Sequence, residues 1–149
     1  MRKVMLGSLL GFALFTQAAM AGQSPDADPR AKSEGLPTFM ISGLHAYKDS
    51  GPDEAVKIWL KGSALEGDSG AMNQASFLRQ ALDSYGAYES FEVISSHNLT
   101  ARTRVIYLAL DYARGPAFAK FMVYRSDQGW ILMNFTFDMR AEAILPPPL

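Results

Sequence analysis

Residues 102–139 read RTRVIYLALDYARGPAFAKFMVYRSDQGWILMNFTFDM, and this stretch decides the fold. Apolar residues alternate along it with a period of two, and β-branched and aromatic residues are frequent, which indicates β-strands. A similar stretch precedes it, after Gly86. The connections are short and carry Gly, Asn, Asp or Ser, so we expect neighbouring strands to pair as antiparallel hairpins. The four predicted strands are 88–97, 102–113, 117–125 and 130–139.

Before Gly86 the apolar residues follow a helical period instead. Leu36, Met40, Leu44 and Tyr47 are spaced by three or four residues and therefore lie on one helix face. Three helices are predicted, at 36–47, 52–61 and 71–85. Helices followed by a run of strands predict an α+β fold, in which N-terminal helices pack on one face of a curved four-stranded antiparallel meander.

The N-terminus has the three parts of a secretory signal peptide. Arg2 and Lys3 precede an apolar run, and Ala19-Met20-Ala21 forms a small-x-small cleavage site. The apolar run is short for a membrane anchor. We therefore expect cleavage after Ala21 and a periplasmic or secreted, soluble product. The predicted organisation is a signal peptide at 1–21, a flexible polar leader at 22–35 and a single domain at 36–149.

Composition and charge exclude several classes of function. The sequence has no cysteine, which excludes disulfides, thiol nucleophiles and cysteine-ligated metals. Its 14 Lys and Arg against 15 Asp and Glu residues give a net charge of -1, and loss of Arg2 and Lys3 leaves 12 against 15, or -3. This balance argues against nucleic acid or an anionic membrane as a partner. His45 and His97 lack a third ligand at a suitable spacing, so we expect no metal site and no cofactor.

The last hairpin carries a family resemblance. The segment Asp127-Gln128-Gly129-Trp130-Ile131-Leu132 enters the final strand through Gly-Trp-Ile. With Tyr47-Lys48 and Asp53-Glu54-Ala55-Val56 in the helical part, it resembles the NTF2-like (cystatin-like) superfamily over about residues 36–140, and more specifically exported bacterial members without an assigned activity. The resemblance implies a cone-shaped fold, sheet-to-sheet dimers and, in the enzymes, a carboxylate in a pocket between sheet and helices. Only four strands are predicted here, whereas some members have more.

The hairpin loops predict which side chains share a face of the sheet. If Arg114-Gly115 forms a two-residue turn, Leu108 lies opposite Phe121; if 126–129 is a four-residue loop, Phe121 lies opposite Asn134. We assign the more aliphatic face to the helices. The other face is aromatic and rich in Met, and we expect a second copy of the chain to cover it, with C-terminal residues folding back as the alternative. The candidate dimer-interface residues are Tyr107, Met122, Tyr124, Met133 and Phe135.

The same register gives candidate ligand-binding residues between sheet and helices. Tyr112, Asn134, Thr136 and Asp138 are expected to line the end of the inner face, and Trp59 or His45 to approach from the helices. A carboxyl group such as that of Asp138 in an apolar pocket would have a raised pKa, as a general acid or base requires. The alternative is that Asp138 simply ends the last strand in solvent. No residue is assigned a catalytic role.

Two classes of function follow from the sequence. The first is an exported module that binds a small apolar ligand or a protein partner in a cavity between sheet and helices. The alternative is a cofactor-free isomerase, dehydratase or hydrolase that uses a cavity carboxylate. A filled or shallow cavity favours the first class, whereas a buried carboxylate with a hydrogen-bonding partner favours the second.

Overall fold

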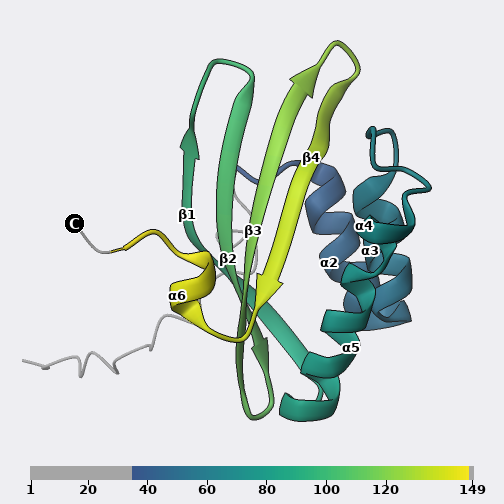
Figure 1. Ribbon diagram of the computed structural model, residues 1–149, viewed down its shortest axis with the longest axis vertical. Coiled ribbons are helices and arrows are strands. Elements are labelled where there is room, and N and C mark those ends of the chain that lie inside the picture. The colour runs from purple at the N-terminus through teal and green to yellow at the C-terminus, as the bar shows by residue number, and fades with distance from the viewer. Residues whose placement is uncertain (1–34, 148–149) are drawn as a thin grey trace, which may run out of the picture.

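The structure is a computed structural model that describes residues 35–147. The predicted signal peptide, and the leader apart from Gly35, lie outside the described residues. Helices pack on one side of a four-stranded antiparallel sheet (Figure 1), which confirms the predicted α+β class. The elements are α2 (Thr38–Ser50), α3 (Pro52–Leu60), α4 (Ser69–Met72), α5 (Gln74–Tyr85), β1 (Tyr88–Asn98), β2 (Thr103–Tyr112), β3 (Gly115–Ser126), β4 (Gly129–Asp138) and α6 (Ala141–Ile144).

Gly51 separates the first two helices. Its φ of 93° lies in the region that side chains disfavour, and its amide donates a hydrogen bond to the carbonyl of Ala46 at 3.0 Å, which ends α2. Pro52 then opens α3, where its missing N–H costs no hydrogen bond. Asp53 and Glu54 follow in the first turn, where their charge favours the helix N-terminus.

The region predicted as a single third helix consists of two. Asp68 caps the short α4 by accepting a hydrogen bond from the amide of Ala71 at 2.7 Å. Asn73 ends α4 and precedes α5, so the helix predicted for 71–85 is interrupted close to its start.

The sheet has the order β1-β2-β3-β4, with every neighbouring pair antiparallel. Tyr112 pairs with Gly115, so the turn is Ala113-Arg114 and not Arg114-Gly115. Leu108 consequently pairs with Ala119, two residues from the expected partner. Because a shift of two residues keeps each side chain on the same face, the face assignment of β2 and β3 is confirmed.

A β-bulge in β4 overturns the face assignment of its second half. Leu132 pairs with Val123 but Asn134 pairs with Met122, so Met133 is an extra residue without a partner. A slip of one residue moves every later side chain to the opposite face. From this point on, the predicted inner and outer faces of β4 are exchanged.

The exchange corrects four site predictions. Phe135 and Phe137 face the helices and are each 5% exposed, so the prediction of Phe135 at a dimer interface is wrong. Asn134, Thr136 and Asp138 pair with Met122, Lys120 and Phe118 on the outer face. The expectation that these three residues line the inner face is therefore also wrong.

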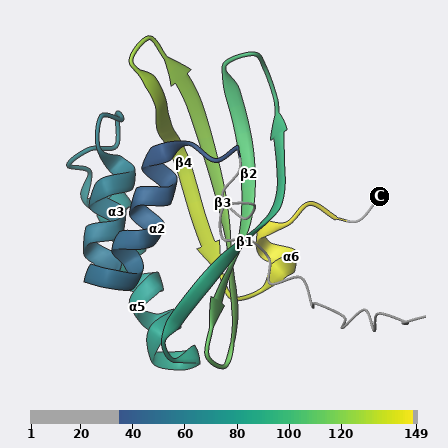
Figure 2. The same cartoon turned by 180° about the vertical axis from the view of Figure 1, so that it is seen from behind.

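The outer face has a cover of its own, the C-terminal helix. In both views α6 lies on the opposite side of the sheet from α2–α5 (Figures 1 and 2). Ile144 is buried against Val105 and Tyr107, and Phe118 and Met122 pack around them. The alternative that C-terminal residues fold back is thus realised over the middle of this face, and Tyr107, a predicted interface residue, is only 7% exposed.

Candidate functional site

The space between sheet and helices is filled by aromatic side chains where a cavity was expected. The indole ring of Trp59 lies 5.2 Å from the ring of Phe121, 6.3 Å from that of Phe135 and 5.8 Å from that of Phe137, measured between centroids. Phe77 stacks on Phe137 at 6.1 Å. These edge-to-face and tilted contacts are typical of a packed core. Phe135 and Phe137 reach this cluster only because of the bulge at Met133.

Trp59 is held in place as a core residue. It is fully buried, and its Nε1–H donates a hydrogen bond to the carbonyl of Met40 at 3.1 Å. The indole lies directly on Gly43 of α2, where any side chain would overlap it. The ring therefore has its polar group satisfied, and the absence of a side chain at Gly43 gives it room.

Three tyrosines fill the other end of the inner face. The hydroxyl of Tyr47 donates to the carbonyl of Leu78 at 3.0 Å and lies 2.8 Å from the hydroxyl of Tyr112. Because the single hydroxyl proton of Tyr47 is used, Tyr112 is the donor in this pair. Burial raises the pKa of Tyr112 to about 12 and raises the pKa values of Tyr47 and Tyr88 further. The pair is therefore a neutral, satisfied core network.

Asp138 has none of the properties of a cavity acid. Its carboxylate accepts hydrogen bonds from the backbone N–H, Nε and Nη2 of Arg140 at 2.9, 3.2 and 3.3 Å. The hydrogen bond from the Arg140 side chain, with its backbone hydrogen bond and charge, lowers the pKa of this carboxyl group. A general acid near neutral pH needs the opposite shift, so Asp138 fits the alternative of a strand-end residue on the surface.

Among the described residues, no other carboxylate lies in the core where Asp138 was expected. Within residues 35–147 no polar or charged residue other than Tyr and Trp is buried, and no buried side-chain nitrogen or oxygen lacks a hydrogen-bond partner. An interior built this way offers no unsatisfied group to a ligand. Across the same residues, no cluster of His, Asp or Glu side chains is arranged to hold a metal ion.

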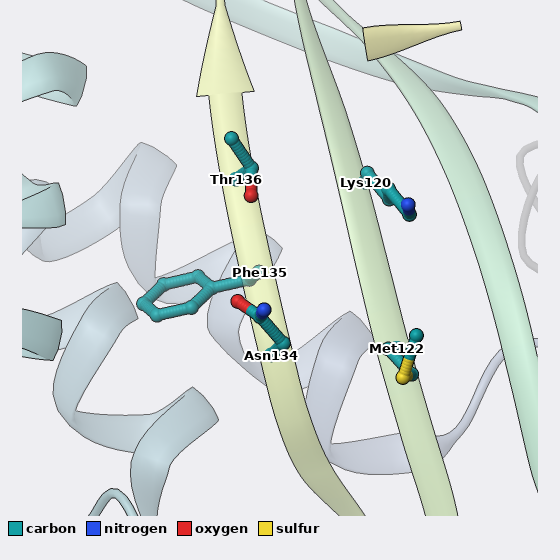
Figure 3. Close-up of a pocket in the computed structure, with 5 residues that line it drawn as sticks. All are labelled: Lys120, Met122, Asn134, Phe135 and Thr136. Carbon is teal, nitrogen blue, oxygen red and sulfur yellow. The ribbon is translucent and has the colours of Figure 1, made fainter. Parts of the chain in front are cut away.

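The outer face carries a small pocket between β3 and β4. Its volume is about 50 Å³. Figure 3 shows the ring of Phe135 projecting toward the helices, whereas the other lining side chains lie over the opposite side of the two strands. The lining residues are Lys120, Met122, Asn134, Phe135 and Thr136.

Lys120 is the charged group of this pocket. It is half-buried and pairs across the sheet with Tyr107 on one side and Thr136 on the other. Among residues 35–147 it has no ion pair and no side-chain hydrogen bond. The other half-buried cation of the sheet, Arg104, in contrast donates to the carbonyl of Gly35 and to Asn98 at 2.8 and 3.0 Å.

Apolar side chains continue from the pocket to the far end of β3 and β4. Met133 is 48% exposed at the bulge. Tyr124 and Ile131 are half-buried and pair directly, and Arg102 lies over the Tyr124 ring at 4.9 Å. We call this part of the outer face, which extends from the edge of the α6 cluster at Met122 to the far end of β3 and β4, the open face. It consists of Lys120, Met122, Tyr124, Ile131, Met133, Asn134 and Thr136.

The structure thus divides the predicted site residues in a new way. Trp59 and Tyr112 belong to the core, as does Phe135, and Tyr107 lies under Ile144. Met122, Tyr124 and Met133 meet Asn134 and Thr136 on the open face, so two sets predicted on opposite faces become neighbours. The sequence analysis missed Lys120 as a site residue; its signal is a lone charge within the apolar run 117–124.

Comparison with known proteins gives a remote structural likeness. No protein-family model matches the chain, and no curated protein matches it either. A domain of unknown function with a cystatin-like fold from Nostoc punctiforme aligns with a TM-score of 0.47 at 14% identity, over 74% of this chain and 78% of that one. The intermembrane space region of the chloroplast protein ARC6 aligns with a TM-score of 0.42 at 13% identity, over 78% of this chain and 100% of that one. These likenesses concern the arrangement of helices and strands and carry no argument about activity.

Proposed function

We propose that this protein is a non-catalytic binding module that works outside the cytoplasm and pairs with a second copy of itself through the open face. The observation that carries the proposal is the exposure of Met133 beside Met122, Tyr124 and Ile131. Met133 is exposed and the other three side chains are half-buried, and apolar side chains that cluster at a surface in this way suit contact with another protein.

The face of the sheet suits a partner better than its edges do. Both edge strands are bulged: β4 at Met133, and β1 at Glu89 and Ile94, the residues skipped by its pairing with β2. Bulges interrupt the regular row of hydrogen-bonding groups that a further strand would need, and they are a common protection against edge pairing. A partner is therefore expected to pack against side chains.

The inner face supports neither a ligand nor a reaction. The aromatic cluster around Trp59 fills the place of the predicted ligand cavity. A cofactor-free isomerase, dehydratase or hydrolase would need a buried carboxylate, and the described residues bury none. Packing against another protein on the outer face is the function that remains best supported.

Self-association and one matched pair of variants test the proposal. Sedimentation velocity of the mature chain at about 50 μM is expected to show a dimer, which corresponds to a dissociation constant of about 10 μM or below. Met133→Asp should weaken the dimer about a hundredfold, because it places an unpaired charge in an apolar contact. Ile94→Asp is the control: Ile94 is similarly exposed, at 43%, and also lies at a bulge, but on the opposite edge of the sheet.

The two variants separate a specific interface from general stickiness. A dimer that withstands Ile94→Asp and dissociates with Met133→Asp supports the open face. Equal effects of both variants, or a wild-type chain that stays monomeric up to about 500 μM, would refute the proposal.

A further inference from the structure

We propose that the pocket on the open face binds a carboxylate of the second copy, and that this carboxylate belongs to Glu142 on its α6 helix. The inference rests on the proposed self-association and names the contact that orients it. Lys120 would supply the charge, with Asn134 and Thr136 as the neighbouring polar groups.

The first argument is the unpaired charge of Lys120. Its ammonium group has no ion pair within the described residues, and apolar side chains such as Met122 flank it. Packing any apolar surface over the open face would remove water from this charge. A buried charge is tolerated only when it is paired and hydrogen-bonded. An interface here therefore requires an anion opposite Lys120.

The second argument is the size and chemistry of the pocket. A volume of about 50 Å³ is far below the roughly 300–1,000 Å³ of typical small-molecule sites. The pocket is therefore better suited to a small functional group than to a whole metabolite. The Asn134 amide and the Thr136 hydroxyl can donate hydrogen bonds to an oxygen that approaches Lys120. These properties fit the carboxylate of a side chain that is carried by another protein surface.

The third argument is the position of Glu142. It is exposed on α6, and within residues 35–147 it forms no ion pair, although its charge acts on Arg140, which is itself bound to Asp138. The helix stands on the outer side of the sheet, beside the open face (Figures 1 and 2). Glu142 is thus an anion without an ion pair on α6, which among residues 35–147 is the helix that stands on this side of the sheet.

Two-fold symmetry connects the unpaired cation with the unpaired anion. In a symmetric dimer each contact occurs twice, so a projecting element on one copy can fill the uncovered area of the other, and the reverse. The α6 helix is the projection and the open face is the uncovered area. Lys120 and Glu142 of opposite copies would then meet in two equivalent pairs.

A charge swap tests this pairing. Lys120→Glu and Glu142→Lys are each expected to raise the dimer dissociation constant about thirtyfold, since close charge pairs across interfaces couple strongly. The double variant Lys120→Glu/Glu142→Lys carries the swapped pair and should return to within about threefold of the wild type. Sedimentation equilibrium measures all four proteins, and circular dichroism verifies that each is folded. The neutral variant Lys120→Met, whose unbranched side chain is one atom shorter, should lose most of the salt dependence of the dissociation constant.

The outcomes distinguish this inference from the proposal on which it rests. A wild-type dimer that Met133→Asp breaks, but that single charge reversals leave intact or the swap fails to restore, would overturn the Lys120–Glu142 pairing alone. A wild-type chain that does not self-associate would overturn both. The pair would be established if both single variants weaken the dimer and the double variant regains a dissociation constant close to that of the wild type.

Discussion

The two faces of β3 differ in how completely other parts of the chain cover them and provide partners for their side chains. Phe121, on the inner face, is fully buried among Trp59, Phe135 and Phe137. Lys120, its neighbour in the strand, points to the outer face and lacks a partner among the described residues. The inner face is a completed core, whereas the outer face is closed by a four-residue helix over its middle and left open beside it. Stability is therefore expected to reside on one face and binding on the other.

The bulge at Met133 produces this difference. It sends the two phenylalanines of β4 inward, where they close the core, and sends Asn134 and Thr136 outward, where they line the pocket. If the same residues paired in a regular register with no bulge, Asn134 and Thr136 would lie against the helices. The bulge thus decides which side chains of β4 complete the core and which line the pocket.

The largest effect is expected from the inner face. Phe121→Ala should lower the free energy of unfolding by about 3–5 kcal/mol, because it removes a fully buried ring and leaves a cavity. Phe118→Ala, in the same strand but on the outer face and only half-buried, should cost about 1–2 kcal/mol. Urea unfolding of both variants gives the comparison. Similar losses for the two phenylalanines would contradict the division of roles between the faces.

A smaller effect is expected at alkaline pH, from the tyrosine end of the inner face. Burial raises the pKa of Tyr112 from the ordinary 10.0 to about 12. Between these values the unfolded chain loses the proton and the folded chain keeps it, so stability is complete below pH 10 and falls as the pH rises toward 12. The loss from Tyr112 approaches about 1.4 kcal/mol per pH unit in this window.

Tyr112→Phe isolates this contribution. At pH 8 the variant should lose only about 1 kcal/mol, for one hydrogen bond to Tyr47. Guanidinium unfolding between pH 8 and about 11.5 should then show a shallower decline than in the wild type. If the two declines run parallel, the tyrosine network is not neutral and buried as described.

The smallest effect is expected from removing the bulged residue Met133 itself. Deleting Met133 leaves Leu132 opposite Val123 and Asn134 opposite Met122 in a regular ladder, so both faces are kept. Stability should change by about 1 kcal/mol or less. Deleting Thr136 instead would turn Phe137 outward and Asp138 inward, and should cost about 3 kcal/mol or more.

Denaturant unfolding of the two deletions compares them directly. A severe loss on deletion of Met133 would mean that β4 pairs with β3 in the regular register that the loop length alone predicts. A mild loss there together with a severe loss at Thr136 supports the bulge.

Much of the candidate site could not be predicted because it depends on how segments distant in sequence meet. The alternation in β2 and β3 correctly gave the inner positions of Leu108 and Phe121, even with the turn displaced by one residue. The same alternation failed in β4, where Met133 interrupts it. The sequence has no local signal at this position, since a bulge here requires neither glycine nor a turn residue.

What the sequence determined by itself is the fold class and the order of the main helices and strands, whereas α6 and the division of α4 from α5 were not predicted. Helical spacing up to Gly86 and strand alternation after it are local patterns, and they fixed helices before an antiparallel sheet. What only the tertiary structure decided is the pairing across β3 and β4 and the position of α6. A one-residue slip of β4 changes no local propensity, so the register is set by the burial of Phe135 and Phe137 around Trp59. The position of α6 is set by the packing of Ile144 against Val105 and Tyr107 on the other face.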